Sequence, residues 1–307
     1  MPEKLNLSRR TFVKGLGLAA STPWLAQSVY AGGITSPAGA SNHKVVTANI
    51  RVALAEDDAK GLGWNDRKDF CIKVLKAQKA DIIGLQEVLK VQAEDLKKAF
   101  PDFMLLGFDG PEMDAHQTGY HGIAKNPIMF RKSRYELNGA GTYWLSNEPN
   151  IGGSMAWETA RARHANYLRL KDRKTGVEFR VVNTHLDHIT QAAREKQIEA
   201  ILKECAQYPE DFIQILTGDF NAGVANAVGA MLKKDGWQDS YAAVHGDKDP
   251  GFTGHGFEGE AFARSNRKID FIFSKGNVKA LASKIIKDSL KGKYPSDHYF
   301  VSADLSF

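Results

Sequence analysis

Short apolar runs recur along this chain of 307 residues, and two kinds of connection join them. Residues 165–171 and 177–184 flank Asp172-Arg173-Lys174-Thr175-Gly176, a pattern typical of a β-hairpin. Other predicted strands are linked by segments of helical periodicity. Those strands lie at residues 44–52, 81–85 and 212–216, and the helices at residues 67–79, 91–100 and 191–205. The mixture of hairpins and helix-linked strands predicts an α/β protein with two packed mixed sheets and helices outside.

The apolar run at residues 212–216 leads directly into Thr217-Gly218-Asp219-Phe220-Asn221. This order predicts a buried strand whose carboxyl end carries an acid and an amide, at a corner where α/β proteins commonly place their chemistry. A carboxylate there can activate water, and an amide can contact a phosphate oxygen. The structural alternative is an Asp-x-Asn turn that caps a helix at residues 226–234, because Asp and Asn are also favoured at such corners.

The first 31 residues are typical of a twin-arginine export signal. Ser8-Arg9-Arg10-Thr11-Phe12 precedes a mildly apolar stretch at residues 15–26, and Val29 and Ala31 suit cleavage after Ala31. A chance arginine pair before a short core helix is the alternative. We expect a signal peptide at residues 1–31, a flexible leader at 32–43 and a single domain at 44–307. The predicted location is the periplasm or the cell exterior, and the predicted partner is the twin-arginine export machinery.

Removal of the signal would leave a nearly neutral domain. The signal holds four basic residues against Glu3, which is +3 of the chain's net charge of +5, so about +2 remains. This balance is compatible with any phosphorylated substrate and gives no specific indication of nucleic-acid binding. Cys71 and Cys205 lie in predicted helices, at a spacing that suggests neither a metal site nor a redox pair. We expect buried free thiols, although an oxidising compartment would also permit a disulfide.

Polar residues stand at several predicted strand ends, where a buried sheet would not hold them without a reason. They are Asn49, Glu87, His185, Asp219 and Asn221, with Asp297 and His298 at the start of a strand predicted at residues 297–301 and Asp270 inside an apolar strand predicted at residues 267–273. A buried carboxylate is costly unless it is paired or bound to a metal. If the two sheets face each other, these ends meet on one rim. Any single member could be structural, and for a lone histidine such as His188 that is the simpler interpretation.

Oxygen ligands without clustered Cys or His favour Mg²⁺, or Mn²⁺, over Zn²⁺. Hydrolysis of a phosphate ester needs a metal for the phosphoryl oxygens, a base for water and donors for developing charge. The set of polar strand ends supplies all three.

Six motifs follow one another along the chain: Asn49, Gln86-Glu87, Asn183-Thr184-His185, Gly218-Asp219-Phe220-Asn221, Ile269-Asp270-Phe271 and Ser296-Asp297-His298. Their order resembles the endonuclease/exonuclease/phosphatase superfamily, from about residue 44 to residue 307. The resemblance implies a four-layer α/β/β/α sandwich and a metal-dependent phosphoesterase. Thr142-Tyr143-Trp144-Leu145-Ser146 is most similar to a bacterial branch related to the carbon catabolite repressor deadenylases.

The resemblance also implies a role for each motif residue at the metal and the attacking water. Glu87 would bind Mg²⁺, with Asn49 and Asp297 near it. Asp219 would orient or deprotonate the water, and Asn221 would contact the phosphate.

Further residues would contact the phosphate by the same resemblance. His298, held by Asp270, would bind the scissile phosphate and stabilise the charge that builds on it. His185 would be a second phosphate ligand or a proton donor. Arg163 is similar to the family's phosphate-contacting arginine, and Arg161 is the alternative.

Two positions depart from the family's pattern. In related sequences a glutamate usually stands seven residues before the position that matches Arg131 and orients the histidine that corresponds to His185. Ala124 occupies that place here, so His185 is expected to lack its carboxylate partner. Arg51, two residues after Asn49, replaces an acid found in some nuclease members, which argues against a second metal contact there.

These features favour an exported, Mg²⁺-dependent phosphoesterase, a monomer, that hydrolyses a phosphodiester in a substrate such as nucleic acid. A phosphomonoester, or a lipid or inositol phosphate, is the alternative on the same fold. A catalytically inactive binding module is a third reading, which the presence of Glu87, Asp219 and His298 disfavours. The predicted loop at residues 113–125, with His116 and His121, is the candidate segment for substrate selection.

Overall fold

The computed structural model of the protein describes residues 40–110, 122–248, 250–262 and 267–307. The predicted signal peptide, most of the predicted leader, and His116 and His121 lie outside these ranges, and the expectations about them stay predictions. Within the described ranges, no helix has both the length and the apolarity that crossing a bilayer requires.

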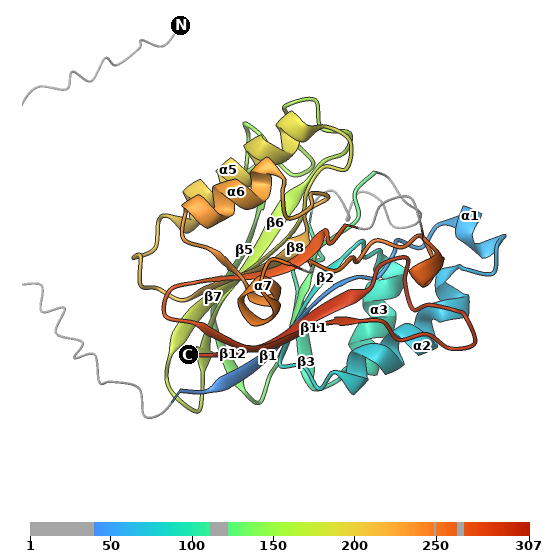
Figure 1. Cartoon of the computed structure of the whole chain (residues 1–307), viewed down its shortest axis with the longest axis horizontal. Coiled ribbons are helices and arrows are strands. Elements are labelled where there is room, and N and C mark those ends of the chain that lie inside the picture. Colours follow the sequence, from blue (N-terminus) through green and yellow to red (C-terminus); the bar gives the residue numbers. More distant parts are fainter. Residues whose placement is uncertain (1–39, 111–121, 249, 263–266) are drawn as a thin grey trace, which may run out of the picture. The chain divides into compact units, whose positions relative to one another are not determined.

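Two mixed sheets, each of six strands in the described part of the chain, form the centre of the domain (Figure 1). The first has the order β11-β12-β1-β2-β4-β3, with β1 at Asn42–Asn49, β2 at Ile82–Gln86, β3 at Phe103–Leu106, β4 at Ile128–Arg131, β11 at Lys279–Ile286 and β12 at Phe300–Ser306. The second has the order β5-β6-β7-β8-β10-β9, with β5 at Tyr135–Trp144, β6 at His164–Asp172, β7 at Glu178–His185, β8 at Gln214–Asp219, β9 at Gln238–Asp239 and β10 at Asp270–Lys275.

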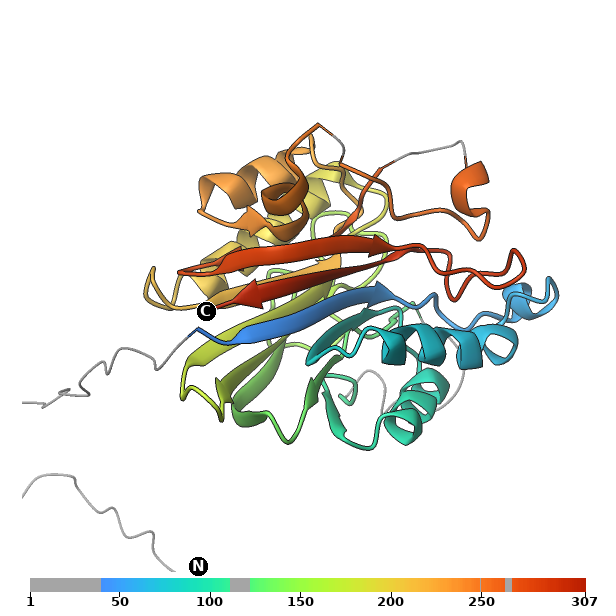
Figure 2. The same cartoon turned by 60° about the horizontal axis from the view of Figure 1, so that its bottom comes forward.

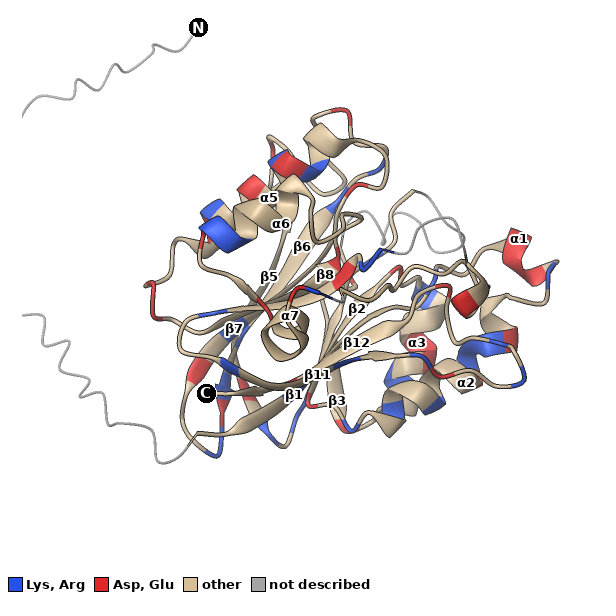
Figure 3. Cartoon of the chain, viewed as in Figure 1, with Lys and Arg blue, Asp and Glu red and all other residues tan. Residues whose placement is uncertain are grey.

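The helices lie outside the two sheets (Figure 2). They are α1 at Ala55–Asp58, α2 at Trp64–Ala77, α3 at Lys90–Ala99, α5 at Gln191–Cys205, α6 at Ala227–Lys234, α7 at Ser240–His245 and the 3-10 helix η1 at Gly259–Ala261. Acidic and basic residues are interspersed along α2, α3 and α5 (Figure 3). Cys71 on α2 and Cys205 on α5 are buried free thiols, as predicted.

Alternation along the strands explains the layers. In β1, Val45 belongs to the core between the sheets, whereas its neighbour Val46 packs with residues of α2 and α3. In β8, Ile215 faces the same inter-sheet core and Leu216 packs with residues of α5 and α6. Because successive side chains of a strand point to opposite faces, each sheet is covered on both sides. The predicted four-layer α/β/β/α sandwich is confirmed.

The connections place the polar strand ends together. β6 and β7 form the predicted antiparallel hairpin, and β7 and β8 are parallel neighbours that α5 joins. The register sets His185 opposite Asp219, and Asp219 opposite Asp270 across β10. Gly218 permits this approach, because a Cβ there would lie 2.5 Å from the backbone oxygen of Thr184.

Candidate active site

Polar residues at strand ends of both sheets line one pocket of about 260 Å³, and Asn49 and Asp270 lie next to it, bonded to the lining residues Asp219 and His298. β1 and β2 bring Asn49 and Glu87 from the first sheet, and the segment before β12 brings Asp297 and His298. β7, β8 and β10 bring His185, Asp219 and Asp270 from the second sheet. One expected boundary is wrong: residues 297–299 precede the strand, which begins at Phe300. The Ser296 hydroxyl ties that segment down, because it donates to the Asn49 carbonyl at 2.7 Å and accepts from the His298 amide at 3.3 Å.

Asn49 connects the two sheets at the pocket. Its Nδ2 donates to Glu87 Oε1 at 3.1 Å and to Asp219 Oδ2 at 3.0 Å. Its Oδ1 accepts the backbone N–H of Arg51 at 3.0 Å. The amide therefore orients both carboxylates, and its oxygen keeps a second lone pair.

Glu87 is fixed by its backbone and by hydrogen bonds. Its φ of 63° lies in the left-handed region, which is uncommon for a residue with a side chain. Burial alone would raise the pKa of Glu87. The hydrogen bond from the Val52 amide at 2.9 Å, the charge of His298 and the bond from Asn49 outweigh burial and lower it. Glu87 is therefore ionised at neutral pH.

Asp219 and Asn221 form a tight corner after β8. Asp219 Oδ1 accepts the Asn221 amide at 2.9 Å, and Asn221 has a φ of 47°. The cap of α6 is Asn226, whose side chain accepts the Val228 amide, so the capping interpretation of the Asp219 corner is wrong. Burial, and then the charge of Asp270, raise the pKa of Asp219 to about 7.

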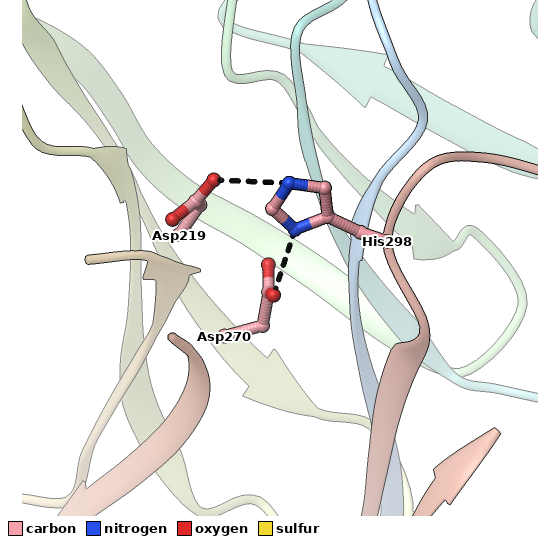
Figure 4. Close-up of side chains that lie close together, drawn as sticks. All are labelled: Asp219, Asp270 and His298. Atoms are coloured by element: carbon pink, nitrogen blue, oxygen red, sulfur yellow. Dashed lines mark hydrogen bonds and ion pairs between the residues drawn. The ribbon is translucent and has the colours of Figure 1, made fainter. Parts of the chain in front are cut away.

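Asp219, Asp270 and His298 lie close together, with the ring of His298 between the two acids (Figure 4). His298 Nδ1 lies 2.9 Å from Asp270 Oδ2, and its Nε2 lies 3.9 Å from Asp219 Oδ2. Burial alone would lower the pKa of His298, but the charges of Asp270, Asp219 and Asp297 raise it well above its usual value. The ring is therefore held as an imidazolium between two carboxylates.

His185 is neutral and lacks a partner at one nitrogen. Asn221 Nδ2 lies 2.9 Å from His185 Nε2 and also donates to the Leu186 carbonyl, so Nε2 is the acceptor and Nδ1 carries the proton. Among the described residues, Nδ1 has no hydrogen-bond partner, and Ala124 lines the same pocket. Burial and the charge of Arg163 lower the pKa of His185 well below its usual value. His185 Nε2 also lies 3.4 Å from Asp219 Oδ2, so the ring has a carboxylate neighbour at Nε2, whereas Nδ1 has none within hydrogen-bond distance in the described part of the chain.

Arg163 and Arg161 lie on the pocket wall, with His188 beside them. Arg163 is 8% exposed, and its Nη2 donates to His188 Nδ1 at 3.1 Å. Its Nε has no partner within the described residues. An arginine buried with so few acceptors is well placed to receive an anion.

Sequence reasoning gave no role to Asp187 and treated His188 as structural. Asp187 is fully buried and accepts four hydrogen bonds, from the Thr159 hydroxyl and from the amides of Ala160, Ile189 and Thr190. It thereby joins the loop of Arg161 and Arg163 to the loop of His188. The signal was present, because Asp187-His188 directly follows the motif that ends in His185.

The oxygen donors of the pocket fit a divalent cation. Glu87 and Asp297 are partly exposed carboxylates on its wall, and hard oxygen ligands of this kind suit Mg²⁺ or Mn²⁺. Asp219, Asp270 and His298 also form a group whose potential ligand atoms lie within 4.8 Å of one another. In that group His298 Nδ1 is already bonded to Asp270, so Glu87 and Asp297 are the better pair to hold a metal.

Comparison with known proteins identifies the family. Residues 46–298 match the Endonuclease/Exonuclease/phosphatase family. The chain belongs to this family. Its members are phosphoesterases that generally use divalent metals, and the chain is accordingly a hydrolase of phosphate-ester bonds.

Solved structures of the family are similar over nearly their whole length. The endonuclease/exonuclease/phosphatase of Bacteroides vulgatus is 28% identical, with a TM-score of 0.75 over 86% of this chain and 98% of that one. The mannosyl-6-phosphatase of Bacteroides thetaiotaomicron is 26% identical, with a TM-score of 0.75 over 86% of this chain and 100% of that one.

Among curated proteins compared by sequence, Nocturnin of Drosophila melanogaster is 24% identical over 222 residues, which are 68% of this chain but only 32% of that protein. The chain thus spans about a third of the length of this curated relative.

Proposed function

We propose that the chain is an exported, Mg²⁺-dependent phosphoesterase that hydrolyses phosphodiester bonds, with nucleic acid as the first substrate class to test. The observation that carries the proposal is the junction of two groups in one pocket. Glu87 and Asp297 can hold a cation, and Asp219 stands beside the Asp270–His298 pair. Export rests on the sequence of residues 1–31, and the monomeric state and the deadenylase-related branch likewise rest on the sequence alone.

Glu87 and Asp297 would hold the Mg²⁺, with Asn49 beside them to fix the carboxylate of Glu87. When bound, the metal would polarise a phosphoryl oxygen and offset charge in the transition state. The other steps belong to the side chains of the pocket.

Asp219 would orient the attacking water and accept its proton. A general base works best when its pKa lies near the working pH, and burial brings the pKa of Asp219 to about 7. Asn49 Nδ2 and the Asn221 amide fix the two carboxylate oxygens, so the base has a defined direction.

His298, protonated and held by Asp270, would donate from Nε2 to the phosphoryl oxygen on which charge builds. Arg163 would bind the remaining phosphate oxygens, and Asn221 Nδ2 would join it only by releasing its bond to His185 Nε2 or to the Leu186 carbonyl. Neutral His185 would serve as a hydrogen-bond donor rather than as the acid that protonates the leaving group, because its pKa is too low.

A phosphomonoester of a small polar molecule is the second candidate. The observation that favours it is the size of the pocket, about 260 Å³, together with Arg161 and Arg163 on its wall. A terminal phosphate carries a second negative charge, which these arginines can receive. The mannosyl-6-phosphatase is a similar protein of the same fold, named for such a substrate.

A hydrolysis panel tests both candidates. Bis-p-nitrophenyl phosphate, single-stranded DNA and RNA represent diesters, sugar phosphates and inositol phosphates represent monoesters, and sphingomyelin represents a lipid phosphodiester. We expect turnover with Mg²⁺ that chelator abolishes, and a preference for the diesters over the monoesters. Asp219→Ala is the control for contaminating enzymes. Equal rates with and without chelator would refute the metal dependence, and turnover of monoesters alone would leave the second candidate.

A further inference from the structure

Arg51 lies at the carboxylates that would hold the metal. Its Nη1 is 3.5 Å from Asp297 Oδ2, and its Nε and Nη2 lie 2.8 Å and 3.3 Å from the two carboxylate oxygens of Asp57. Arg51, Glu56, Glu87 and Asp297 all line the pocket. A permanent positive charge thus stands within the acidic part of the site.

The position of this charge is tightly fixed. Arg51 has a φ of 57°, and its N–H donates to Asn49 Oδ1. Its carbonyl accepts from Arg67 Nη2 at 2.6 Å and from Gln92 Nε2 at 2.8 Å. A strained backbone that persists in such a network marks a conformation that its surroundings determine. The backbone of Arg51 is thereby fixed, and its guanidinium is held by the two bonds to Asp57 and the ion pair with Asp297.

Arg67 adds to this rigidity from α2. The side chain is 4% exposed and also donates to the carbonyls of Ile50 and Pro295. It holds the chain after β1 against the segment that carries Asp297. A buried cross-link thus fixes the backbone segments that carry Arg51 and Asp297 relative to each other.

We propose that Arg51 is the built-in second cation of this centre, so that the pocket binds one divalent metal per chain and excludes another. The proposal rests on the metal dependence proposed above. A second divalent ion would need free carboxylates, whereas Asp57 is occupied by Arg51 and Asp297 is shared with it. The guanidinium would also repel an ion placed beside it.

Counting of bound Mn²⁺ by electron paramagnetic resonance tests the proposal on the full chain, without any substrate. We expect one Mn²⁺ per wild-type chain and two for Arg51→Asp, which removes the fixed cation and supplies an oxygen ligand. Arg51→Gln should still bind one, about tenfold more tightly, as expected when a unit charge near a divalent ion is lost. Arg161→Asp is the matched control, because it makes the same charge change in the same pocket and should leave only one Mn²⁺ bound.

Each result is decisive in one direction. Two Mn²⁺ in the wild-type chain, or an unchanged affinity in Arg51→Gln, would overturn the role of Arg51 and leave the proposed function standing. No Mn²⁺ in the wild-type chain would overturn the metal dependence and this inference with it. If Arg51→Asp fails to give a cooperative thermal transition, the wild-type count and Arg51→Gln still decide.

Discussion

Replacement of Asp219 by Asn should abolish activity and stabilise the metal-free fold at the same time. The pKa of Asp219 is raised from 3.8 to about 7, by burial and by Asp270. An acid whose pKa is raised by folding has no effect on stability at pH values below its pKa in the unfolded chain, because it is then protonated in both the folded and the unfolded state. Above the folded pKa the full penalty applies, and about 1.4 kcal/mol per pKa unit gives a penalty of about 4 kcal/mol at pH 8.

The isosteric amide removes this penalty and introduces a smaller one. Asn49 Nδ2 donates to Asp219 Oδ2, and an amide nitrogen placed there would leave a buried donor unpaired, at about 2 kcal/mol. The net gain of Asp219→Asn is therefore about 2 kcal/mol, or a melting temperature higher by about 5 °C. Without the base, kcat should fall by about 10²-fold or more.

Thermal and urea unfolding in chelator at pH 8, with hydrolysis assays in Mg²⁺, measure both effects. Asp187→Asn is the matched control, because the pKa of this buried acid is shifted in the opposite direction. Asp187 is equally buried, but hydrogen bonds from four donors outweigh burial and lower its pKa. Its replacement should destabilise the fold by about 2 kcal/mol. If Asp219→Asn is less stable than wild type, or keeps more than a tenth of its activity, the reasoning about the buried base is wrong.

Three further predictions concern other parts of the chain. His298→Ala should lower kcat by about 10²-fold or more while the far-ultraviolet circular dichroism stays unchanged; rates near wild type would exclude its charge-stabilising role. Replacement of Arg9 and Arg10 by Lys should leave the protein in the cytoplasm on cell fractionation, and unchanged delivery would count against twin-arginine export. Burial and the charge of Arg134 lower the pKa of His43 from 6.5 to about 3, so the unfolded chain takes up a proton first as pH falls. Stability should drop by about 2 kcal/mol from pH 6.5 to pH 5, and His43→Phe should flatten that slope in urea titrations.

Several residues of the site could be predicted from the sequence because they are polar residues within or at the end of apolar runs. Asp270 follows Ile269 and precedes Phe271, and Asp219 ends an apolar strand. Such residues stand out in any reading of hydrophobic pattern, and the register of β8 and β10 then sets them side by side. The fold followed from the same pattern, since hairpins and helix-linked strands have different spacings.

Other parts of the site depend on contacts that no local pattern reveals. Arg67 belongs to an ordinary amphipathic helix, and only the packing of α2 against the end of β1 makes it a buried cross-link. His188 is an exposed residue, and only its hydrogen bond with Arg163, 25 positions away in the sequence, connects it to the site. The start of β12 was misplaced because the aromatic and β-branched residues after Asp297 suggested a longer strand, whereas the Ser296 hydroxyl holds this segment in a turn.

The pocket draws its members from both sheets, and the bonds Asn49–Asp219 and His298–Asp270 cross between them. Neither half of the sandwich contains a working set, so chemistry cannot arise before the two halves have docked. Activity is then a sensitive reporter of domain assembly. A substitution in the inter-sheet core at Val45 or Ile215 that shifts one sheet relative to the other would lower the rate of hydrolysis. Circular dichroism would still record a folded protein. During evolution, the inner core of such a protein is under selection for alignment as well as for stability.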